Sequence, residues 1–235
     1  MYKRILLKIS GEQLSGTNSS GIDTKIAVKL SENIKKALEQ TNTQIIIVVG
    51  AGNIVRGKNV AGDGVKRVTA DHMGMLGTMI NALALTDIFE SRDIPTRCMS
   101  NIFAAQVAEP FNHRLANKHL ERGRVVIVAG GIGRPYLTTD TAAVSLALEL
   151  DCDAVLKATK VDGVYDKDPT KFNDAKKIES LDYQRALSDN EIQVMDKAAL
   201  GLAMDHKMKV VVFDSFGENN LLNVVKENSV GTVIG

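Results

Sequence analysis

The stretch that decides the fold class reads Arg4-Ile5-Leu6-Leu7-Lys8-Ile9-Ser10-Gly11-Glu12. A continuous apolar strand that ends in a cation and a Gly/Ser turn is typical of open α/β sheets, which bind ligands at the carboxyl ends of their strands. Gly11 lets backbone N–H groups approach a phosphate, and Lys8 can answer the negative charge that builds up in phosphoryl transfer. The pattern alone is not specific, because a strand followed by glycine occurs throughout α/β proteins. Two further loops of a phosphate-binding type follow it, and none of the three is a P-loop.

Further strand-like runs alternate with helix-length segments along the chain. After Ile5–Ile9, the expected strands are Gln44–Val49, Thr96–Met99, Val125–Ala129, Ala154–Lys157 and Val210–Asp214. The amphipathic segments expected to form helices are Thr24–Gln40, Asp71–Glu90, Thr141–Leu150 and Asn190–Asp205. Apolar strands separated by helices predict an α/β fold with an open, mainly parallel central sheet that helices cover on both faces. No repeat, low-complexity tract or linker interrupts residues 1–235, which favours one domain.

The composition describes an ordinary globular protein. Of 235 residues, 44% are hydrophobic, and 29 basic residues balance 28 acidic ones. This balance gives no basic surface for nucleic acid or anionic lipid, and the absence of Trp weakens base stacking. No apolar run reaches the roughly 18–20 residues of a membrane span, and Met1–Arg4 leads into a strand rather than a signal peptide. Cys98 and Cys152 are isolated, so we expect reduced thiols in a cytoplasmic protein that binds neither nucleic acid nor membrane.

The second loop, Gly50–Gly57, directly follows a predicted strand. Gly50 and Gly52 open a backbone cradle, and Arg56 can add a bidentate clamp on phosphate oxygens. The spacing differs from the dinucleotide fingerprint GxGxxG. The alternative interpretation is a tight strand-to-helix turn with a surface arginine.

The third loop runs from Ala129 into a predicted helix. Thr138, Thr139 and Asp140 lie where a helix N-terminus presents free N–H groups and a positive dipole, which suits an anion. Alternatively, Thr139 or Asp140 is a plain N-cap.

Two more candidate positions follow predicted strands or begin a helix. Asp71 opens a long predicted helix, where it is either an N-cap or a carboxylate that accepts hydrogen bonds from ribose hydroxyls. The segment Lys157–Pro169 joins a strand to a predicted hairpin around Asp162-Gly163. In it, Thr159, Tyr165 and Asp168 can frame a purine and its ribose, or the hairpin is simply exposed. The four histidines show no metal-ligand spacing, so no protein-bound metal is expected.

Together these motifs resemble the amino acid kinase family, and within it the bacterial uridylate (UMP) kinases. The resemblance runs from Tyr2 to the C-terminus, and its signatures are Lys8–Glu12, Asp71–Leu76, Thr138–Asp140, Lys157–Pro169 and Val194–Ala199. The run Asp71–Leu76 separates uridylate kinases from acetylglutamate, glutamate and aspartate kinases of similar fold. The resemblance implies a three-layer αβα sandwich that transfers the γ-phosphate of ATP to UMP, which gives UDP in pyrimidine nucleotide biosynthesis.

The resemblance also implies a role for each matching residue. Lys8, Arg56 and Asp140 would be catalytic, with Asp140 orienting Lys8. The residues expected to bind ATP are Lys8, Ile9, Ser10, Gly11, Gly52, Arg56, Thr159, Tyr165 and Asp168. The residues expected to bind UMP are Ala51, Asp71, Ile132, Gly133, Arg134, Pro135, Tyr136, Leu137, Thr138 and Thr139. Lys157 and Asp196 would support the site, and Mg²⁺ would be held mostly by phosphate oxygens and water.

The resemblance further implies a cytoplasmic homohexamer that GTP activates and UTP inhibits. Gly16–Gly21 corresponds to part of the region linked to GTP, and its alternative interpretation is a flexible surface turn.

Two loops depart from the family pattern. The second loop usually reads Gly-Gly-Gly-Asn, and here Ala51 takes its middle position. The third loop usually reads Gly-Thr-Gly-Asn-Pro, and here Ile132 and Arg134 replace the threonine and asparagine expected to face the uracil. Arg134 can bond the uracil carbonyls instead, and we expect UMP to be preferred over CMP.

Two alternative functions stay open. The first is a kinase for a small carboxylate such as an amino acid, against which Asp71–Leu76 argues. The second is a non-catalytic nucleotide-binding or storage member of the same fold. That alternative predicts loss of the lysine or its aspartate, yet Lys8 and Asp140 are both present.

Overall fold

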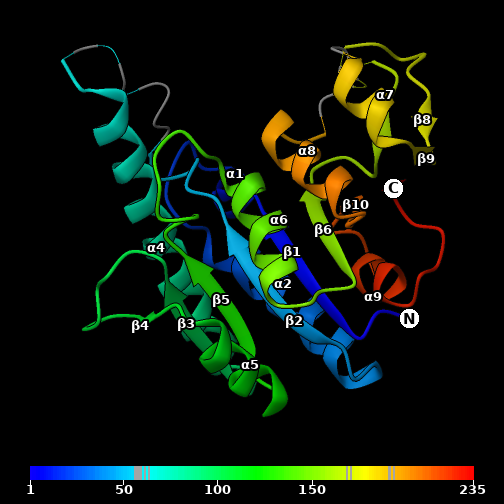
Figure 1. Cartoon of the computed structure of the whole chain (residues 1–235). Helices are drawn as coiled ribbons and strands as arrows, with labels where there is room; N and C mark the ends of the chain where they lie inside the picture. The colour runs from blue at the N-terminus through cyan, green and yellow to red at the C-terminus, as the bar shows by residue number, and fades with distance from the viewer. Residues whose placement is uncertain are drawn as a thin grey trace.

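A nine-stranded sheet forms the centre of the structure, a computed structural model that describes residues 1–55, 60, 62, 64–167, 169, 171–189, 192 and 194–235 (Figure 1). Its strand order is β4-β3-β5-β2-β1-β6-β10-β11-β9. The strands are β1 (Arg4–Ile9), β2 (Gln44–Val49), β3 (Thr96–Ser100), β4 (Glu109–Pro110), β5 (Val125–Ala129), β6 (Ala154–Thr159), β9 (Ser180–Leu181), β10 (Lys209–Asp214) and β11 (Thr232–Ile234). Only the β10–β11 pairing of this sheet is antiparallel within the described residues, so the predicted open, mainly parallel sheet is confirmed.

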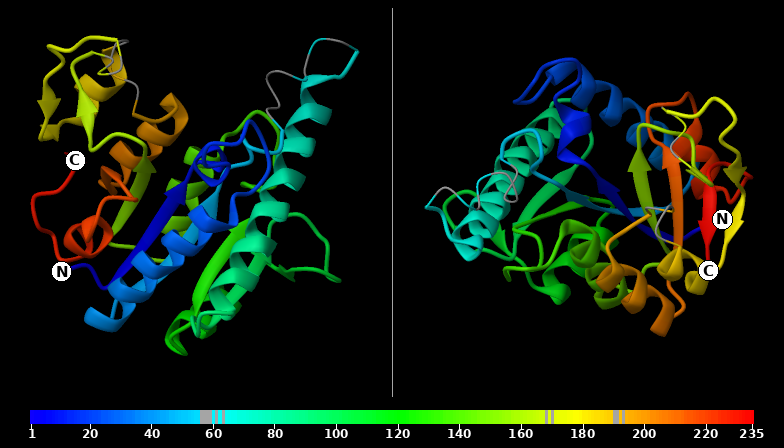
Figure 2. Two further views of the ribbon diagram at one scale, coloured as in Figure 1. Left: turned by 180° about the vertical axis from the view of Figure 1, so that it is seen from behind. Right: turned by 90° about the horizontal axis from the view of Figure 1, so that it is seen from above.

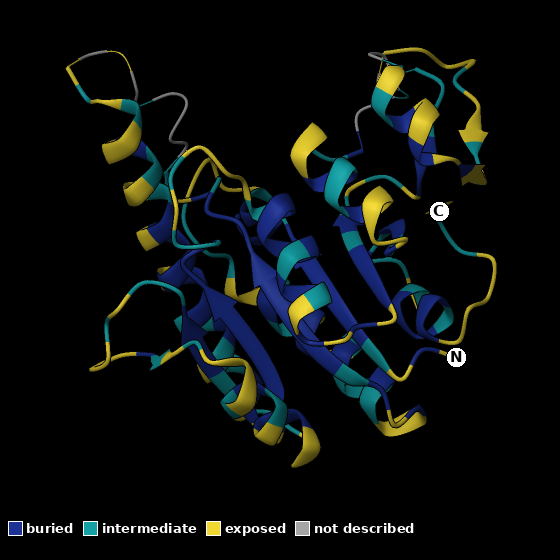
Figure 3. Cartoon of the chain, in the orientation of Figure 1, coloured by how far each residue is buried: buried dark blue, intermediate teal, exposed yellow. Residues whose placement is uncertain are grey.

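Helices cover both faces of the sheet, which confirms the three-layer αβα sandwich (Figure 2). One layer contains α2 (Thr24–Gln40), α4 (Arg67–Glu90) and α9 (Asn220–Val225). The other contains α5 (His113–Glu121), α6 (Thr139–Glu149), α7 (Tyr183–Ser188) and α8 (Lys197–Asp205). A one-turn helix, α1 (Gly11–Leu14), follows β1. The central strands β1, β2, β3, β5, β6 and β10 are almost entirely buried, and exposed residues gather on the outer sides of the helices (Figure 3). Within the described residues, no helix is both long enough and apolar enough to cross a bilayer.

The alternation of side chains along β1 decides where its lysine points. Ile5, Leu7 and Ile9 pack in the core beneath α2, α4 and α9, whereas Leu6 packs in the core beneath α5, α6 and α8. Because alternate residues of a strand share a face, Lys8 lies on the same face as Leu6. The fold therefore directs the Lys8 ammonium toward the layer that contains α6.

Three predictions about local structure were wrong. Helix α4 begins at Arg67, so Asp71 lies inside the helix and is not its N-cap. Helix α8 begins at Lys197 with Asp196 as its N-cap, whereas a start at Asn190 was predicted and Asn190 itself lies outside the described residues. No tight hairpin forms around Asp162-Gly163, because β7 (Val164–Tyr165) pairs antiparallel with the distant β8 (Lys177–Ile178).

Candidate functional site

Two lysines from neighbouring strands share one carboxylate at the carboxyl edge of the sheet. Lys8 of β1 and Lys157 of β6 are register partners, so their side chains lie next to each other on one face. The Lys8 Nζ lies 2.8 Å from Asp140 Oδ1, and the Lys157 Nζ lies 2.8 Å from Asp140 Oδ2. Asp140 enters from the first turn of α6 and is 9% exposed. This ion group carries two positive charges against one negative charge, which leaves a surplus cation for an anionic ligand.

The ion group shifts the protonation of its own members. Burial works to raise the pKa of Asp140, but the charges of Lys8 and Lys157 outweigh it and hold this pKa below its ordinary value. Burial lowers the pKa of Lys157, and the Asp140 carboxylate only partly offsets this effect. Asp140 is therefore ionised at neutral pH and acts as a fixed counter-charge, not as a proton acceptor.

The start of α6 is fixed by Thr138 and Asp196. Thr138 is the N-cap, and its side chain accepts a 3.0 Å hydrogen bond from the Asp140 N–H. The alternative of Thr139 or Asp140 as N-cap is therefore wrong. The Thr138 and Thr141 hydroxyls both donate to Asp196, whose side chain also caps α8 by accepting from Ala199 N–H at 2.9 Å. Asp196 thus ties α6 to α8 and supports the position of Asp140.

The second loop packs directly against the turn after β1. A Cβ atom at Gly11 would lie 2.6 Å from the Gly50 carbonyl oxygen and 2.7 Å from the Gly52 nitrogen. Both neighbours are backbone atoms, so only glycine fits at position 11. The loop is also held by a reciprocal amide pair, in which Asn53 Nδ2 donates to Asn81 Oδ1 at 2.9 Å and Asn81 Nδ2 donates to Asn53 Oδ1 at 2.8 Å. Sequence reasoning missed this buried pair.

We expect Gly11→Ala to destabilise the protein by about 1–3 kcal/mol, because the added methyl overpacks two backbone segments. The control is Gly201→Ala in α8, where a Cβ would meet nothing within 4 Å. That change should instead stabilise by roughly 0.5–1 kcal/mol, since alanine costs less backbone entropy in a helix. Urea unfolding measures both, and equal midpoints for Gly11→Ala and the natural protein would contradict the close contact.

Ala51 sits in the second loop without backbone strain. Ala51 does not have a positive φ, so its backbone avoids the left-handed region that favours glycine. Its methyl group occupies space next to Gly77 of α4, where a Cβ would lie 2.9 Å from the Ala51 Cβ. The loop thus accepts alanine because the facing helix position is glycine. Arg56, also expected in this loop, lies outside the described residues.

The first of two pockets at this edge, the α4 pocket, lies between α4 and the loops after β2 and β5. It has a volume of about 190 Å³. Seven of the residues expected to bind UMP line it: Ala51, Asp71, Ile132, Arg134, Leu137, Thr138 and Thr139. Gly133 and Pro135 flank Arg134 in the chain and are not part of the lining.

Asp71 is held in the α4 pocket by two donors. The Arg67 Nε donates to both of its oxygens, at 2.8 and 2.9 Å, and the Tyr136 N–H donates to Oδ2 at 2.8 Å. Burial works to raise the pKa of Asp71, but these hydrogen bonds and the Arg67 charge lower it overall. The Arg67 guanidinium also lies 5.4 Å from the centre of the Tyr136 ring. Arg67 was missed from the sequence, although its spacing of four residues from Asp71 was the available signal.

The second pocket, the β6 pocket, lies beyond the end of β6 and has a volume of about 510 Å³. Lys157, Thr159 and Tyr165 are among its lining residues, as are the further cations Lys167 and Lys171. The Thr159 side chain donates to the carbonyls of Val161 and Phe213, at 2.6 and 3.2 Å, so its proton is already engaged by the backbone. The Tyr165 hydroxyl donates to Asp162 Oδ1 at 2.7 Å. Asp168 lies outside the described residues.

The ion group lies between the two pockets. Lys157 belongs to the lining of the β6 pocket, and Thr139, the neighbour of Asp140, belongs to the lining of the α4 pocket. Gly11 and Gly52 lie close together beside the end of β1. Successive backbone N–H groups in such a turn can form a concave anion-binding site. Ile9 is fully buried in the core, so only its backbone can contribute. The arrangement can hold two anionic ligands with their charged ends at Lys8 and Lys157.

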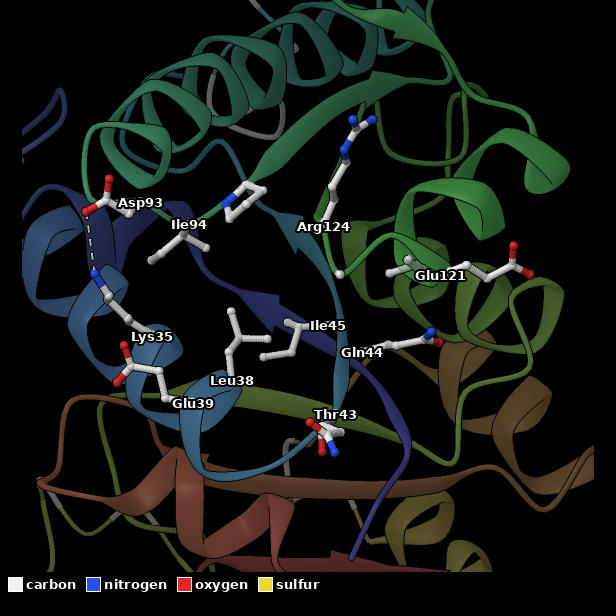
Figure 4. A pocket seen from close by; sticks show the side chains of 14 residues that line it. Lys35, Leu38, Glu39, Thr43, Gln44, Ile45, Asp93, Ile94, Glu121 and Arg124 are labelled. Atoms are coloured by element: carbon white, nitrogen blue, oxygen red, sulfur yellow. Dashed lines mark ion pairs between the residues drawn. The ribbon is translucent and has the colours of Figure 1, made fainter.

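A third hollow lies at the opposite edge of the sheet, where the strands begin (Figure 4). It has a volume of about 440 Å³ and an apolar floor that includes Leu38, Ile45 and Ile94. Lys35 and Asp93 form a 3.8 Å ion pair on its rim. Its charged groups are of both signs, and none belongs to the ion group.

Comparison with known sequences assigns the family. The sequence profile of the Amino acid kinase family matches residues 3–214. The chain belongs to this family.

Relatives within the amino acid kinase family resemble the chain over nearly its whole length. It is 47% identical to the uridylate kinase of Sulfurimonas denitrificans over 229 residues, which cover 97% of this chain and 96% of the relative. It is 49% identical to the uridylate kinase of Aliarcobacter butzleri over 227 residues, covering 96% of each. The crystal structure of the UMP kinase from Bacillus anthracis superimposes with a TM-score of 0.94 at 37% identity, covering 100% of this chain and 96% of the other.

Across the residues that the structure describes, no group of three or more His, Cys, Asp or Glu side chains is arranged to hold a metal ion. The carboxylate nearest the centre of this amino acid kinase site, Asp140, has each of its oxygens within 2.8 Å of an ammonium group.

Proposed function

We propose that the chain is an ATP-dependent UMP kinase that transfers the γ-phosphate of ATP to UMP and forms UDP. The observation that carries this proposal is the Lys8–Asp140–Lys157 ion group between two pockets. The names and full-length similarity of the uridylate kinase relatives support the substrate pair. The function belongs to one domain that spans residues 1–235.

In this proposal ATP occupies the β6 pocket and UMP occupies the α4 pocket, with their phosphates meeting at the ion group. The attacking group is a phosphate oxygen of UMP, so no nucleophilic side chain or general base is required. Lys8 and Lys157 spread positive charge over the phosphoryl group in transit, and Asp140 fixes where both ammonium groups point. Arg56 supplies a further cation from the second loop.

Backbone groups complete the phosphate site. Gly11 and Gly52 contribute N–H groups on the ATP side, and Ala51 and Thr139 do so on the UMP side. The Ser10 N–H already donates to Gln13 Oε1 at 3.1 Å, so Ser10 contributes its hydroxyl to the ATP side instead. The closeness of the two loops around Gly11 keeps these donors at fixed positions, which lowers the reorganisation needed during transfer. Thr159, Tyr165 and Asp168 frame the adenosine, where Thr159 can serve only as an acceptor.

Mg²⁺ reaches the site on the phosphates of ATP. The donor set of the chain fits an ion held in this way, because both oxygens of Asp140 are engaged by lysines and Mg²⁺ prefers phosphate oxygens and water. When bound, the ion offsets phosphate charge.

The proposal includes a cytoplasmic homohexamer with GTP as activator and UTP as inhibitor. One exposed stripe supports self-association: Met73, Leu76 and Ile80 of α4 are 38%, 51% and 50% exposed and follow one another at helical spacing. A second copy of the chain can cover this stripe, since contiguous exposed apolar side chains commonly mark protein interfaces.

One assay tests the proposed function. Mg-ATP is offered with UMP, CMP, dTMP, glutamate and aspartate as acceptors, and ADP release is followed. We expect UMP to give the fastest turnover. Phosphorylation of an acidic amino acid would favour the small-carboxylate kinase, and absence of turnover with every acceptor from folded protein would favour the non-catalytic alternative.

Asp71 is expected to act on UMP binding alone. Asp71→Asn removes the charge that Arg67 holds and weakens the acceptor for the ribose hydroxyls, so KM for UMP should rise by roughly tenfold, as one charge-assisted hydrogen bond is worth about 1.5–3 kcal/mol. KM for ATP should stay unchanged. The matched control is Asp205→Asn at the exposed end of α8. An equal rise in KM for UMP and KM for ATP would contradict a role of Asp71 in binding UMP alone.

A further inference from the structure

Arg134 is a cation in the α4 pocket that the described residues leave unpaired. Its side chain lines the pocket and is exposed, and no hydrogen bond or ion pair with another described residue engages it. Most other polar side chains of the wall are occupied: Arg67 pairs with Asp71, Thr78 bonds two backbone groups, and Thr138 donates to Asp196. Arg134 is therefore the charged group of this wall that remains available to a ligand.

The backbone on both sides of Arg134 is fixed. The Gly133 N–H donates to the Gly130 carbonyl at 2.9 Å, and Asn101 Nδ2 donates to the Gly131 carbonyl at 2.6 Å. On the other side, Pro135 restricts the chain and the Tyr136 N–H is bound to Asp71. A held backbone with an unpartnered guanidinium is a pre-organised donor, because little entropy is lost at the main chain when a ligand binds.

The order of residues along this loop matches the order of groups in a nucleoside monophosphate. Thr139 adjoins Asp140 and the ion group, where the phosphate must lie for transfer. Tyr136 is bound to Asp71, the acceptor suited to the ribose. Arg134 lies two residues farther from the ion group along the chain, where the base follows the ribose. This step rests on the proposed function, since it assumes a nucleotide acceptor in the α4 pocket.

We propose that Arg134 determines base specificity by donating hydrogen bonds to O4 of uracil. O4 is the acceptor of uracil farthest from the ribose, and cytosine carries a donating amino group at the same position. A guanidinium has donors and no acceptor, so it bonds O4 but opposes the cytosine amino group. The neighbouring Ile132 adds apolar contact that does not distinguish the two bases.

The test measures kcat/KM for UMP and for CMP with the full chain and two variants. Arg134→Ala should lower the ratio of UMP to CMP by about tenfold or more, because a good side-chain pairing with a base discriminates by about 1–3 kcal/mol. Arg134→Gln should raise kcat/KM for CMP, since its amide offers an acceptor as well as donors. Arg114→Ala, an exposed arginine of α5, is the control and should leave the ratio unchanged.

The outcomes separate this proposal from the function on which it rests. If kcat/KM of Arg134→Ala fell equally for UMP and CMP, the guanidinium would act on the phosphate or ribose, and base reading would be overturned. If neither value of kcat/KM changed, base reading would be overturned as well. If instead the natural protein failed to phosphorylate UMP, the proposed function would be wrong irrespective of Arg134. Calorimetric titration of each variant with UMP and CMP checks that a changed ratio reflects binding of the base.

Discussion

Replacing Lys8 with methionine is expected to lower kcat for UMP phosphorylation by about two orders of magnitude or more, because a pre-organised charge donor to the transferring group is lost. The fold should survive, since Asp140 keeps its 2.8 Å ion pair with Lys157. The substitution lowers the net charge of the buried ion group from +1 to zero, because Asp140 and Lys157 remain as a balanced pair. We therefore expect unchanged or increased thermal stability together with the loss of turnover.

Single-turnover kinetics and thermal unfolding of the same Lys8→Met preparation measure the two effects. The control is Lys29→Met on the exposed side of α2, which should change neither. Turnover close to that of the natural protein in folded Lys8→Met would contradict a catalytic role for Lys8. A large loss of stability would instead show that Lys8 mainly supports the fold.

Asp140→Asn is expected to damage both stability and activity, because it leaves two buried ammonium groups side by side without a counter-charge. Removing one partner from a buried ion group typically costs about 3–5 kcal/mol. Turnover should fall as well, since nothing then fixes where Lys8 and Lys157 point. The loss of stability should be smaller when Asp140→Asn is combined with Lys8→Met, because the repulsion between the two lysines disappears.

Acidification provides a second readout for Asp140. Its pKa in the folded state is lower than its ordinary value, so it binds a proton less readily when folded than when unfolded. The contribution of ionised Asp140 to the free energy of unfolding is complete above the pKa of about 4 that an Asp has in the unfolded chain. It is lost as the pH falls toward the lower pKa of Asp140 in the folded state. Urea unfolding below pH 5 should show this loss in the natural protein and a flatter dependence in Asp140→Asn. Parallel curves would exclude Asp140 as the source.

The central sheet and the cation at Lys8 could be predicted from the sequence because they depend on local patterns. Buried parallel strands are continuous apolar runs, and Lys8 interrupts one of them just before a glycine. The sharing of Asp140 by two lysines could not be predicted in this way. It follows from the β1–β6 register, which pairs residues far apart in the chain.

The wrong predictions have a related cause. Asp71 resembles an N-cap because it precedes an apolar helical pattern, but the helix continues back to Arg67, whose side chain pairs with it. The dipeptide Asp162-Gly163 is typical of a tight hairpin, yet Val164 and Tyr165 find their strand partners only at Ile178 and Lys177. In both cases residues beyond the local motif decided the structure: a neighbour one helical turn away for Asp71, and a distant strand for Asp162-Gly163.

The contact between Ala51 and Gly77 constrains the order in which this loop can change over evolution. The space between the second loop and α4 has no room for methyl groups at both positions, because a Cβ at Gly77 would lie 2.9 Å from the Ala51 Cβ. A lineage that gains alanine at position 77 must therefore first, or at the same time, return position 51 to glycine. Intermediates with alanine at both positions would be selected against, whereas those with glycine at both merely leave a small gap. Among homologues, the sizes of these two residues should covary, although neither residue carries a charge or a reactive group.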